Sequence, residues 1–152
     1  MADYSFITKW KFEEPIEAVW DEIYHPERWP DWWKYVENAS EIQKGDDLGI
    51  GSKWKYTWKT RLFYKFTFLV ETNIVDPPFR LEGIAKGDLE GIGKWLLEYK
   101  SGYTVVKYEW VVKTNKSWMN LLAPVAYIFF KWNHSTVMEE GYKGLKKKLK
   151  KK

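Results

Sequence analysis

The chain of 152 residues contains no cysteine and only two histidines. Without cysteine there is no disulfide bond, no thiol nucleophile and no cysteine-ligated metal site. A zinc site made of other ligands needs about three side chains placed together, but His25 and His134 are isolated and no HExxH motif is present. The sequence therefore predicts a protein without a metal ion, and it indicates no other cofactor.

Long apolar runs are also missing. The N-terminal stretch MADYSFITKWKFEE contains no apolar signal region. The apolar run at 118–130 is too short to cross a membrane, and Asn120 and Pro124 interrupt it. We expect a cytoplasmic protein without a transmembrane segment.

Motifs for nucleophilic catalysis and for phosphate binding are absent as well. No serine lies in a GxSxG elbow, and there is neither a P-loop nor a GxGxxG motif that opens a helix. Gly91 and Gly93 fall in a predicted strand, on the same face as Trp95. This placement favours a bend in a sheet, or room for a ring from a neighbouring strand, over a nucleotide site.

Basic charge is concentrated at one end of the chain. The formal net charge is +4, but seven of the 25 basic residues lie in the C-terminal stretch KGLKKKLKKK, and the remaining 18 are set against 21 acidic residues. Such a body has no cationic face for nucleic acid, so no nucleic-acid partner is predicted. We interpret the lysine-rich tail, residues 146–152, as a solvated helix end that complements the helix dipole. Weak contact with an anionic membrane is the alternative.

Aromatic residues are abundant. They make up 19% of the chain, with 11 tryptophans and 10 tyrosines. Hydrophobic residues reach 45% and charged residues 30%, so we assign residues 1–152 to a single folded domain. Rings of this size either fill a core or line a pocket.

The N-terminal part predicts a strand and two short helical segments. Residues 4–12 alternate between apolar and other side chains, as a strand does. Pro15 precedes apolar residues at helical spacing in EEPIEAVWDEIY, and HPERWPDWW adds a second helical piece between prolines. His25 is interpreted as a turn residue at the junction of the two.

From residue 36 to 115 the apolar period is two, which predicts about six antiparallel strands. VENASEIQKG is expected to be a weak edge strand. In SKWKYTWK the aromatic residues share one face and the lysines the other, and in KFTFLVETNIVD residues 66, 68, 70, 72 and 74 are expected to share a face. Such alternation predicts a sheet that is wet on one side and covered on the other.

A long C-terminal helix starting near Ser117 is expected to cover the sheet. Pro124 either kinks this helix or marks its first turn. Gly141 would allow a close approach of helix and sheet, and His134 would point inward. The predicted inward stripe comprises Tyr127, Phe130, His134, Met138, Gly141, Leu145 and Leu149.

This order of elements predicts an α+β fold in which a curved antiparallel sheet wraps around the long helix and leaves a hollow. The chain resembles the START/Bet v 1-like (SRPBCC) superfamily, which has the helix-grip fold, and in particular its bacterial polyketide cyclase/dehydrase-like branch. The resemblance implies a deep apolar cavity for a lipid-like or aromatic small molecule. It leaves the chemistry open, because members include transporters, ligand sensors, aromatase/cyclases and hydrolytic or isomerising enzymes. The stretches that carry it cover most of the chain: PIEAVWDEIYHPERWPDWW, VDPPFRLEG, GDLEGIGKW and LLAPVAYIFFKWNHSTVMEEGYKGL.

Side chains from the sheet and the helix are expected to meet in the hollow. A core filled solidly by rings is the alternative to an open cavity. The predicted ligand-binding residues are Trp54, Tyr56, Trp58, Phe66, Phe68, Trp95, Tyr108, Trp110, Tyr127, Phe130, His134 and Met138.

The predicted function is the binding of a hydrophobic small molecule. One alternative is a cyclase-, dehydrase- or isomerase-like enzyme in which His134 is the acid or base, with Tyr56, Tyr99 or Tyr108 across the cavity. In the other interpretation His134 is oriented by a hydrogen bond and only shapes the site or recognises the ligand.

A second alternative is an interaction module. Val125, Phe129 and Trp132 lie off the apolar stripe of the helix. They either pack under RWPDWW or form a partner surface. In the interaction module, RWPDWW, Phe129, Trp132 and the lysine tail would meet a protein or a membrane. A homodimer is the default expectation for such an apolar surface.

Overall fold

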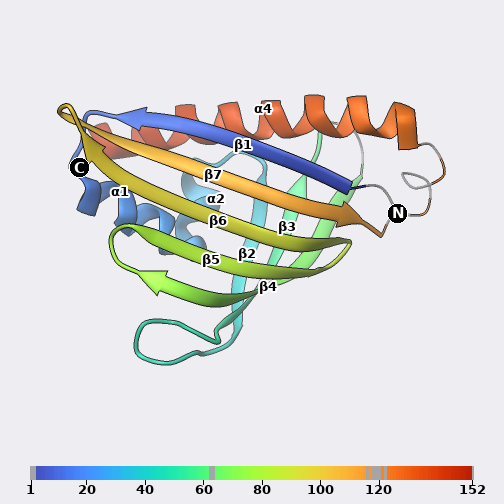
Figure 1. Cartoon of the computed structure of the whole chain (residues 1–152), viewed down its shortest axis with the longest axis horizontal. Coiled ribbons are helices and arrows are strands. Elements are labelled where there is room, and N and C mark those ends of the chain that lie inside the picture. The colour runs from blue at the N-terminus through green and yellow to red at the C-terminus, as the bar shows by residue number, and fades with distance from the viewer. Residues whose placement is uncertain (1–2, 62–63, 116, 118–120, 122, 152) are drawn as a thin grey trace.

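A computed structural model describes residues 3–61, 64–115, 117, 121 and 123–151 of the chain. A strongly curved sheet lies beside one long helix, and the short helices sit behind the sheet (Figure 1). This is the predicted α+β helix-grip arrangement. The elements are β1 (Asp3–Phe12), α1 (Ile16–Ile23), the 3-10 helix η1 (Pro26–Arg28), α2 (Trp29–Trp32), β2 (Val36–Gln43), β3 (Lys53–Lys59), β4 (Lys65–Asp76), β5 (Arg80–Gly87), β6 (Leu89–Lys100), β7 (Tyr103–Thr114) and α4 (Ala123–Lys150).

The first and last strands of the chain are neighbours in the sheet. Its order is β1-β7-β6-β5-β4-β3-β2, and every neighbouring pair is antiparallel. Only the first strand is out of chain order, since β1 pairs with β7. The predicted edge strand is indeed an edge, because β2 pairs with β3 alone within the described residues.

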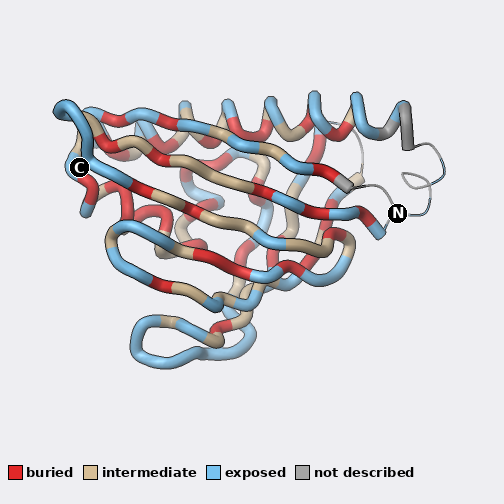
Figure 2. Tube along the Cα trace, viewed as in Figure 1, coloured by how far each residue is buried: buried red, intermediate tan, exposed pale blue. Residues whose placement is uncertain are grey.

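Burial follows the alternation of the sequence along most strands. In β1, Tyr4, Trp10 and Phe12 are buried while Ser5 and Lys9 are exposed. Figure 2 shows the same red and blue alternation along the front strands. A strand that is half buried shows this period because successive side chains point to opposite faces.

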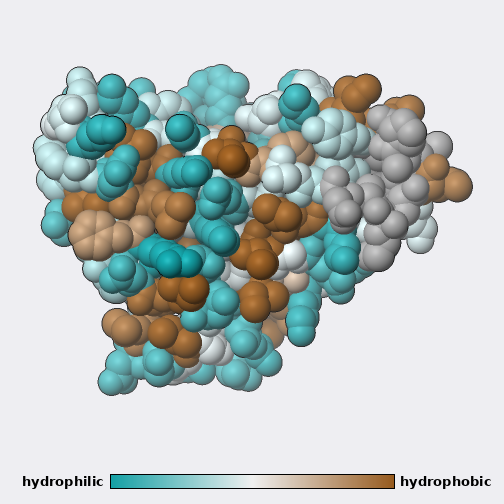
Figure 3. Space-filling model, in the orientation of Figure 1, coloured by the Kyte–Doolittle hydropathy of each residue, from teal (hydrophilic) through white to brown (hydrophobic). Residues whose placement is uncertain are grey.

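The outer face of the sheet is less wet than the sequence pattern predicts. Ile84, Ile92 and Val111 are direct cross-strand neighbours there, and they are 39%, 42% and 53% exposed. Figure 3 shows such brown patches among teal residues on this face. The prediction of a polar outer face is therefore wrong at these positions.

Strand β4 departs from a single alternating face. A register shift lies between Thr72 and Ile74, so that Ile74 pairs with Glu82 and Val75 pairs with Leu81. The extra residue reverses the phase of the strand, as a β-bulge does. Val75 is buried while Ile74 is only half-buried, so the predicted face of residues 66–74 ends at Thr72.

Helix α4 places its apolar stripe on the core. Ser117 and Leu121, which precede α4, are also helical, so whether Pro124 kinks the helix or stands in its first turn depends on positions outside the described residues. Of the positions between the predicted start at Ser117 and Ala123, the structure describes only Ser117 and Leu121. The buried stripe residues are Phe130, Met138, Gly141, Leu145 and Leu149, and His134 is half-buried.

The segment RWPDWW packs against the middle of α4. Trp33 is 1% exposed, and its indole N–H donates to the carbonyl oxygen of Val137 at 2.8 Å. A Cβ on Gly141 would lie 2.5 Å from the Trp33 ring, and one on Gly144 would overlap the carbonyl oxygen of Trp32. The predicted close approach at Gly141 is therefore made to Trp33, at the end of α2, and not to the sheet.

Three other helix residues do not meet RWPDWW. Val125 is 68% exposed, and Trp132 is 44% exposed beneath the guanidinium of Arg61 at 4.2 Å. Phe129 instead contacts the rings of Tyr64 and Trp132. The first turns of α4 thus leave an apolar row in solvent.

The lysine-rich end is part of α4 as far as Lys150. Leu149 is 4% exposed, while Lys147 and Lys150 are exposed on the opposite side. Lysines in a last helical turn stabilise the negative pole of the helix dipole.

Candidate functional site

A cavity of about 290 Å³ lies between the sheet, α4 and the short helices. Its size is at the lower end of ligand-binding pockets. The chain therefore keeps a hollow although its rings are numerous enough to have filled it.

The predicted ligand-binding residues converge on this cavity. All of them line it except Tyr127, which is 44% exposed and stacks on Tyr4 with ring centroids 5.8 Å apart. Tyr127 lies one turn before Phe130 in α4. At that level the helix packs against the start of β1, outside the cavity. The lining residues are Trp54, Tyr56, Trp58, Phe66, Phe68, Trp95, Tyr108, Trp110, Phe130, His134 and Met138.

Two tryptophans missed by the sequence interpretation also form the wall. Trp29 stacks on Tyr56 at 5.4 Å between centroids, and Trp33 meets Trp58 edge-on at 4.8 Å. Both line the cavity. The aromatic density of RWPDWW was the available signal, but a short helix between prolines does not by itself indicate which face it buries.

Glycines shape the floor of the cavity. Gly83 and Gly93 are cross-strand neighbours in β5 and β6, and both line the cavity. A Cβ on Gly93 would lie 3.0 Å from the Tyr108 hydroxyl and 3.2 Å from the Trp110 ring. Of the two interpretations of the Gly-x-Gly pair, room for neighbouring rings therefore applies at Gly93.

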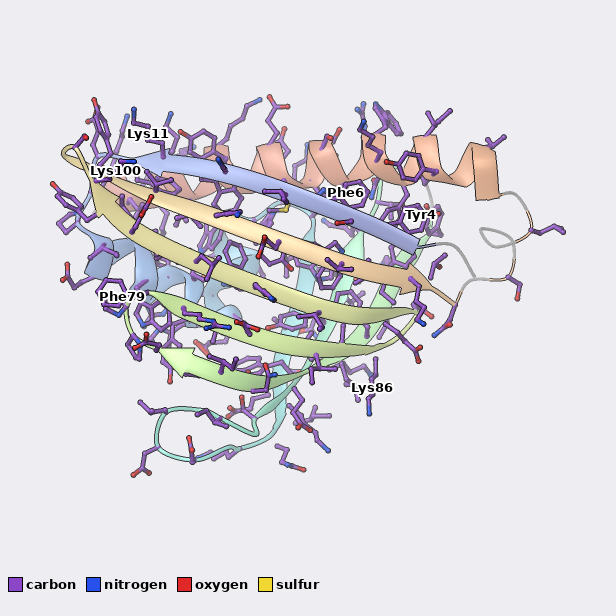
Figure 4. All side chains as sticks on the ribbon, in the orientation of Figure 1. Tyr4, Phe6, Lys11, Phe79, Lys86 and Lys100 are labelled. Carbon is purple, nitrogen blue, oxygen red and sulfur yellow. The ribbon has the colours of Figure 1, made fainter. Side chains whose placement is uncertain are left out.

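His134 is the histidine of the cavity wall. Its ring stacks on Phe6 at 4.3 Å with an interplanar angle of 15°. Figure 4 shows Phe6 and Tyr4 between β1 and α4. The Nε2 atom of His134 is buried and has no hydrogen-bond partner among the described residues. Burial lowers the pKa of His134 from 6.5 to about 4, so the ring is neutral near pH 7.

The depressed pKa makes stability depend on pH. Between pH 6.5 and 4 the unfolded chain binds a proton at His134 that the folded protein does not, so stability is lost as the pH falls through this window. We expect this group to lower the free energy of unfolding by about 2 kcal/mol between about pH 7.5 and pH 5. Urea denaturation of the wild type and of His134→Gln at both pH values measures it. The same pH dependence in both proteins would contradict the assignment.

The tyrosines of the cavity are neutral donors at physiological pH. Burial raises the pKa of Tyr108. The pKa of Tyr56 is raised mainly by burial and further by the nearby Tyr108 and Glu27 side chains. Tyr99 was predicted to face His134 across the cavity, but this placement is wrong. Its side chain is 57% exposed near the end of β6, beyond the part of the strand that borders the cavity.

The rim of the cavity is formed by α1, η1 and the loop after β2. The hydroxyl of Tyr24 donates to the carbonyl oxygen of Leu48 and so joins the two sides. His25 stands at the residue before η1 without making a side-chain cap, in agreement with its interpretation as a turn residue, and it lines the rim. Glu27 and Glu41 also line the cavity, and both are exposed.

Within the described part of the chain, no group of three histidine, aspartate or glutamate side chains is arranged to hold a metal ion. No helix within those residues combines the length and the apolar character needed to span a bilayer.

Known proteins match the chain through structure and not through sequence. No family model and no curated protein sequence matches it. A START superfamily protein from Mycobacterium smegmatis gives a TM-score of 0.78 at 10% identity over 97% of each chain. The Zhui aromatase/cyclase from Streptomyces sp. R1128 gives 0.74 at 9% identity over 97% of this chain and 94% of that one.

A third match is the di-domain ARO/CYC BexL from the BE-7585A biosynthetic pathway. Its TM-score is 0.76 at 16% identity over 95% of this chain. The match covers 49% of BexL, so this chain spans about half of that protein's length.

The chain has the START/Bet v 1-like helix-grip fold. The stretches on which the sequence resemblance rests form elements of this fold, since PIEAVWDEIYHPERWPDWW spans α1, η1 and α2 and WNHSTVM lies in α4. In this START-like fold the cavity is enclosed by the sheet and the long helix. Identities of this order concern the fold, so the chemistry has to be argued from the residues of the cavity.

Proposed function

We propose that this protein binds a hydrophobic small molecule, of lipid-like or aromatic type, in the cavity between sheet and helix. The observation that carries the proposal is a cavity of about 290 Å³ walled by tryptophan, tyrosine and phenylalanine side chains from four strands (β3, β4, β6 and β7), α2 and α4. Apolar walls with a few polar groups are typical of small-molecule sites. The START superfamily and aromatase/cyclase structures that share the fold are consistent with it.

An enzyme of the cyclase, dehydrase or isomerase type is the second candidate, because the matched structures include the aromatase/cyclases BexL and Zhui. His134 would be its base, since the neutral ring can accept a proton. A catalytic histidine is usually oriented by a second group. Here only the ring of Phe6 and neighbouring apolar side chains are seen against His134 within the described residues. Binding alone therefore has the stronger support.

A surface role remains a separate proposal. Leu121, Val125, Ile128 and Trp132 recur at helical spacing and are 83%, 68%, 70% and 44% exposed. A protein, a membrane or a second copy of the chain would each cover such a row. Three expectations from the sequence remain predictions: membrane contact through the lysine tail, a homodimer, and a cytoplasmic location.

Native mass spectrometry of gently purified protein tests the binding proposal. We expect an adduct of a few hundred daltons that is lost on unfolding, because a molecule of that size matches the volume of the cavity. A control spectrum under denaturing conditions distinguishes a bound from a covalent adduct. A clean apo mass, together with no binding of any planar aromatic probe in calorimetry, would overturn the proposal.

A further inference from the structure

The wall of the cavity contains a hydrogen-bond donor that the protein itself does not satisfy. The indole Nε1 of Trp58 is buried and has no partner among the described residues. The Trp58 ring is held edge-on against Trp33 at 4.8 Å and against Trp29 at 6.3 Å. A ring clamped in this way cannot turn its N–H toward solvent, and an unsatisfied buried donor is costly.

The two tryptophans packed against Trp58 show the usual arrangement. Trp33 donates to the carbonyl oxygen of Val137 at 2.8 Å, and Trp29 donates to that of Glu22 at 3.1 Å. The indole Nε1 of Trp32 is also buried without a partner among the described residues, but Trp32 does not line the cavity, whereas Trp58 does. A buried polar group without a protein partner in the wall of a cavity indicates that something in the cavity completes it.

Lys59 is the one lysine or arginine among the described residues that line the cavity. It is exposed at the end of β3, and because it follows Trp58 its ammonium group extends from the opposite face of the strand, away from the interior. Glu82 is paired with Arg80, while Glu27 and Glu41 put negative charge on the rim. The inner polar groups are neutral: the hydroxyls of Tyr56 and Tyr108, the indole of Trp58 and the imidazole of His134.

We infer, on the basis of the proposed function, that the ligand is a flat, uncharged molecule whose carbonyl oxygen accepts the Trp58 N–H, and that the cavity rejects carboxylates. A carboxylate would pass an acidic rim and then lose its water without meeting a cation, which is strongly unfavourable. The small volume and the stacked walls fit two or three fused rings better than a long acyl chain.

Three probes of one shape test this inference by isothermal titration calorimetry. Fluorene carries no acceptor, 9-fluorenone adds one ketone, and fluorenone-4-carboxylate adds a negative charge to the ketone. We expect 9-fluorenone to bind about fivefold more tightly than fluorene, the usual value of one hydrogen bond. We expect the carboxylate to bind at least about tenfold more weakly than 9-fluorenone.

Two tryptophan variants locate the effect. Trp58→Phe keeps a ring but removes the N–H, so the preference for 9-fluorenone over fluorene should vanish. Trp132→Phe removes an indole N–H from a half-exposed ring that does not line the cavity and should keep the preference. Circular dichroism and urea denaturation verify that both variants fold, and a fluorene affinity within about twofold of wild type shows that the cavity of Trp58→Phe is intact.

The outcomes separate this inference from the proposed function. Binding of all three probes with equal affinity, or an unchanged ketone preference in Trp58→Phe, overturns the inference and leaves a hydrophobic binding protein. Tighter binding of the carboxylate overturns it as well. Binding of none of the probes, combined with a clean apo mass, counts against the proposed function itself.

Discussion

Replacing Gly144 by alanine is expected to lower the free energy of unfolding by at least about 3 kcal/mol. The added Cβ would overlap the carbonyl oxygen of Trp32, a backbone atom that no rotamer change can move. Trp32 and Trp33 are both buried, so α2 would have to withdraw from α4 and expose them. Alanine favours a helix over glycine by only about 1 kcal/mol, which is too little to offset this loss.

Urea denaturation measures the effect, and Lys143→Ala is the matched control. Lys143 is the preceding residue on the same helix, and its ion pair with Glu139 at 3.3 Å is more than half exposed on both sides. Such a pair contributes little, so the control should change stability by no more than about 0.5 kcal/mol. If Gly144→Ala is as stable as the control, α2 and α4 do not approach as closely as described.

Filling the cavity is expected to abolish binding without unfolding the protein. Val70 lies in β4, lines the cavity and is half-buried. An indole at this position would occupy a large part of the space of about 290 Å³, and aromatic residues suit a strand. We expect Val70→Trp to lower the affinity for 9-fluorenone at least about tenfold and to change stability by less than about 1.5 kcal/mol.

The adjacent residue supplies the control for this experiment. Leu69 points to the outer face of the same strand and is 37% exposed. Leu69→Trp adds the same ring outside the sheet and should leave the calorimetric affinity unchanged. Equal binding by both variants would mean that the probe binds elsewhere on the protein.

Much of the fold was predictable because local patterns and tertiary contacts agree. Strands such as β1 and β3 are buried on one face only, so their period of two is visible in the sequence. The stripe from Phe130 to Leu149 has the helical period for the same reason. These two patterns were enough to place nearly all predicted cavity residues on surfaces that face one another.

The errors occur where a position depends on a neighbour that is remote in sequence. The bulge after Thr72 moved Ile74 off the inner face, and the geometry at the ends of their elements left Tyr99 and Tyr127 outside the cavity. Gly141 was assigned to a contact with the sheet but meets Trp33. The spacing of apolar residues cannot predict these placements, because each depends on one contact or one inserted residue and not on a repeated pattern.

The sequence by itself determined the class of fold, the strand and helix faces, and the absence of cysteine chemistry, since these follow from composition and from the spacing of apolar residues. Only the tertiary structure decided that the rings leave a hollow instead of filling it, and that the N–H of Trp58 faces no protein acceptor while those of Trp29 and Trp33 do. Both depend on how side chains from distant elements pack in three dimensions, and packing of this kind has no signature in the order of residues along the chain.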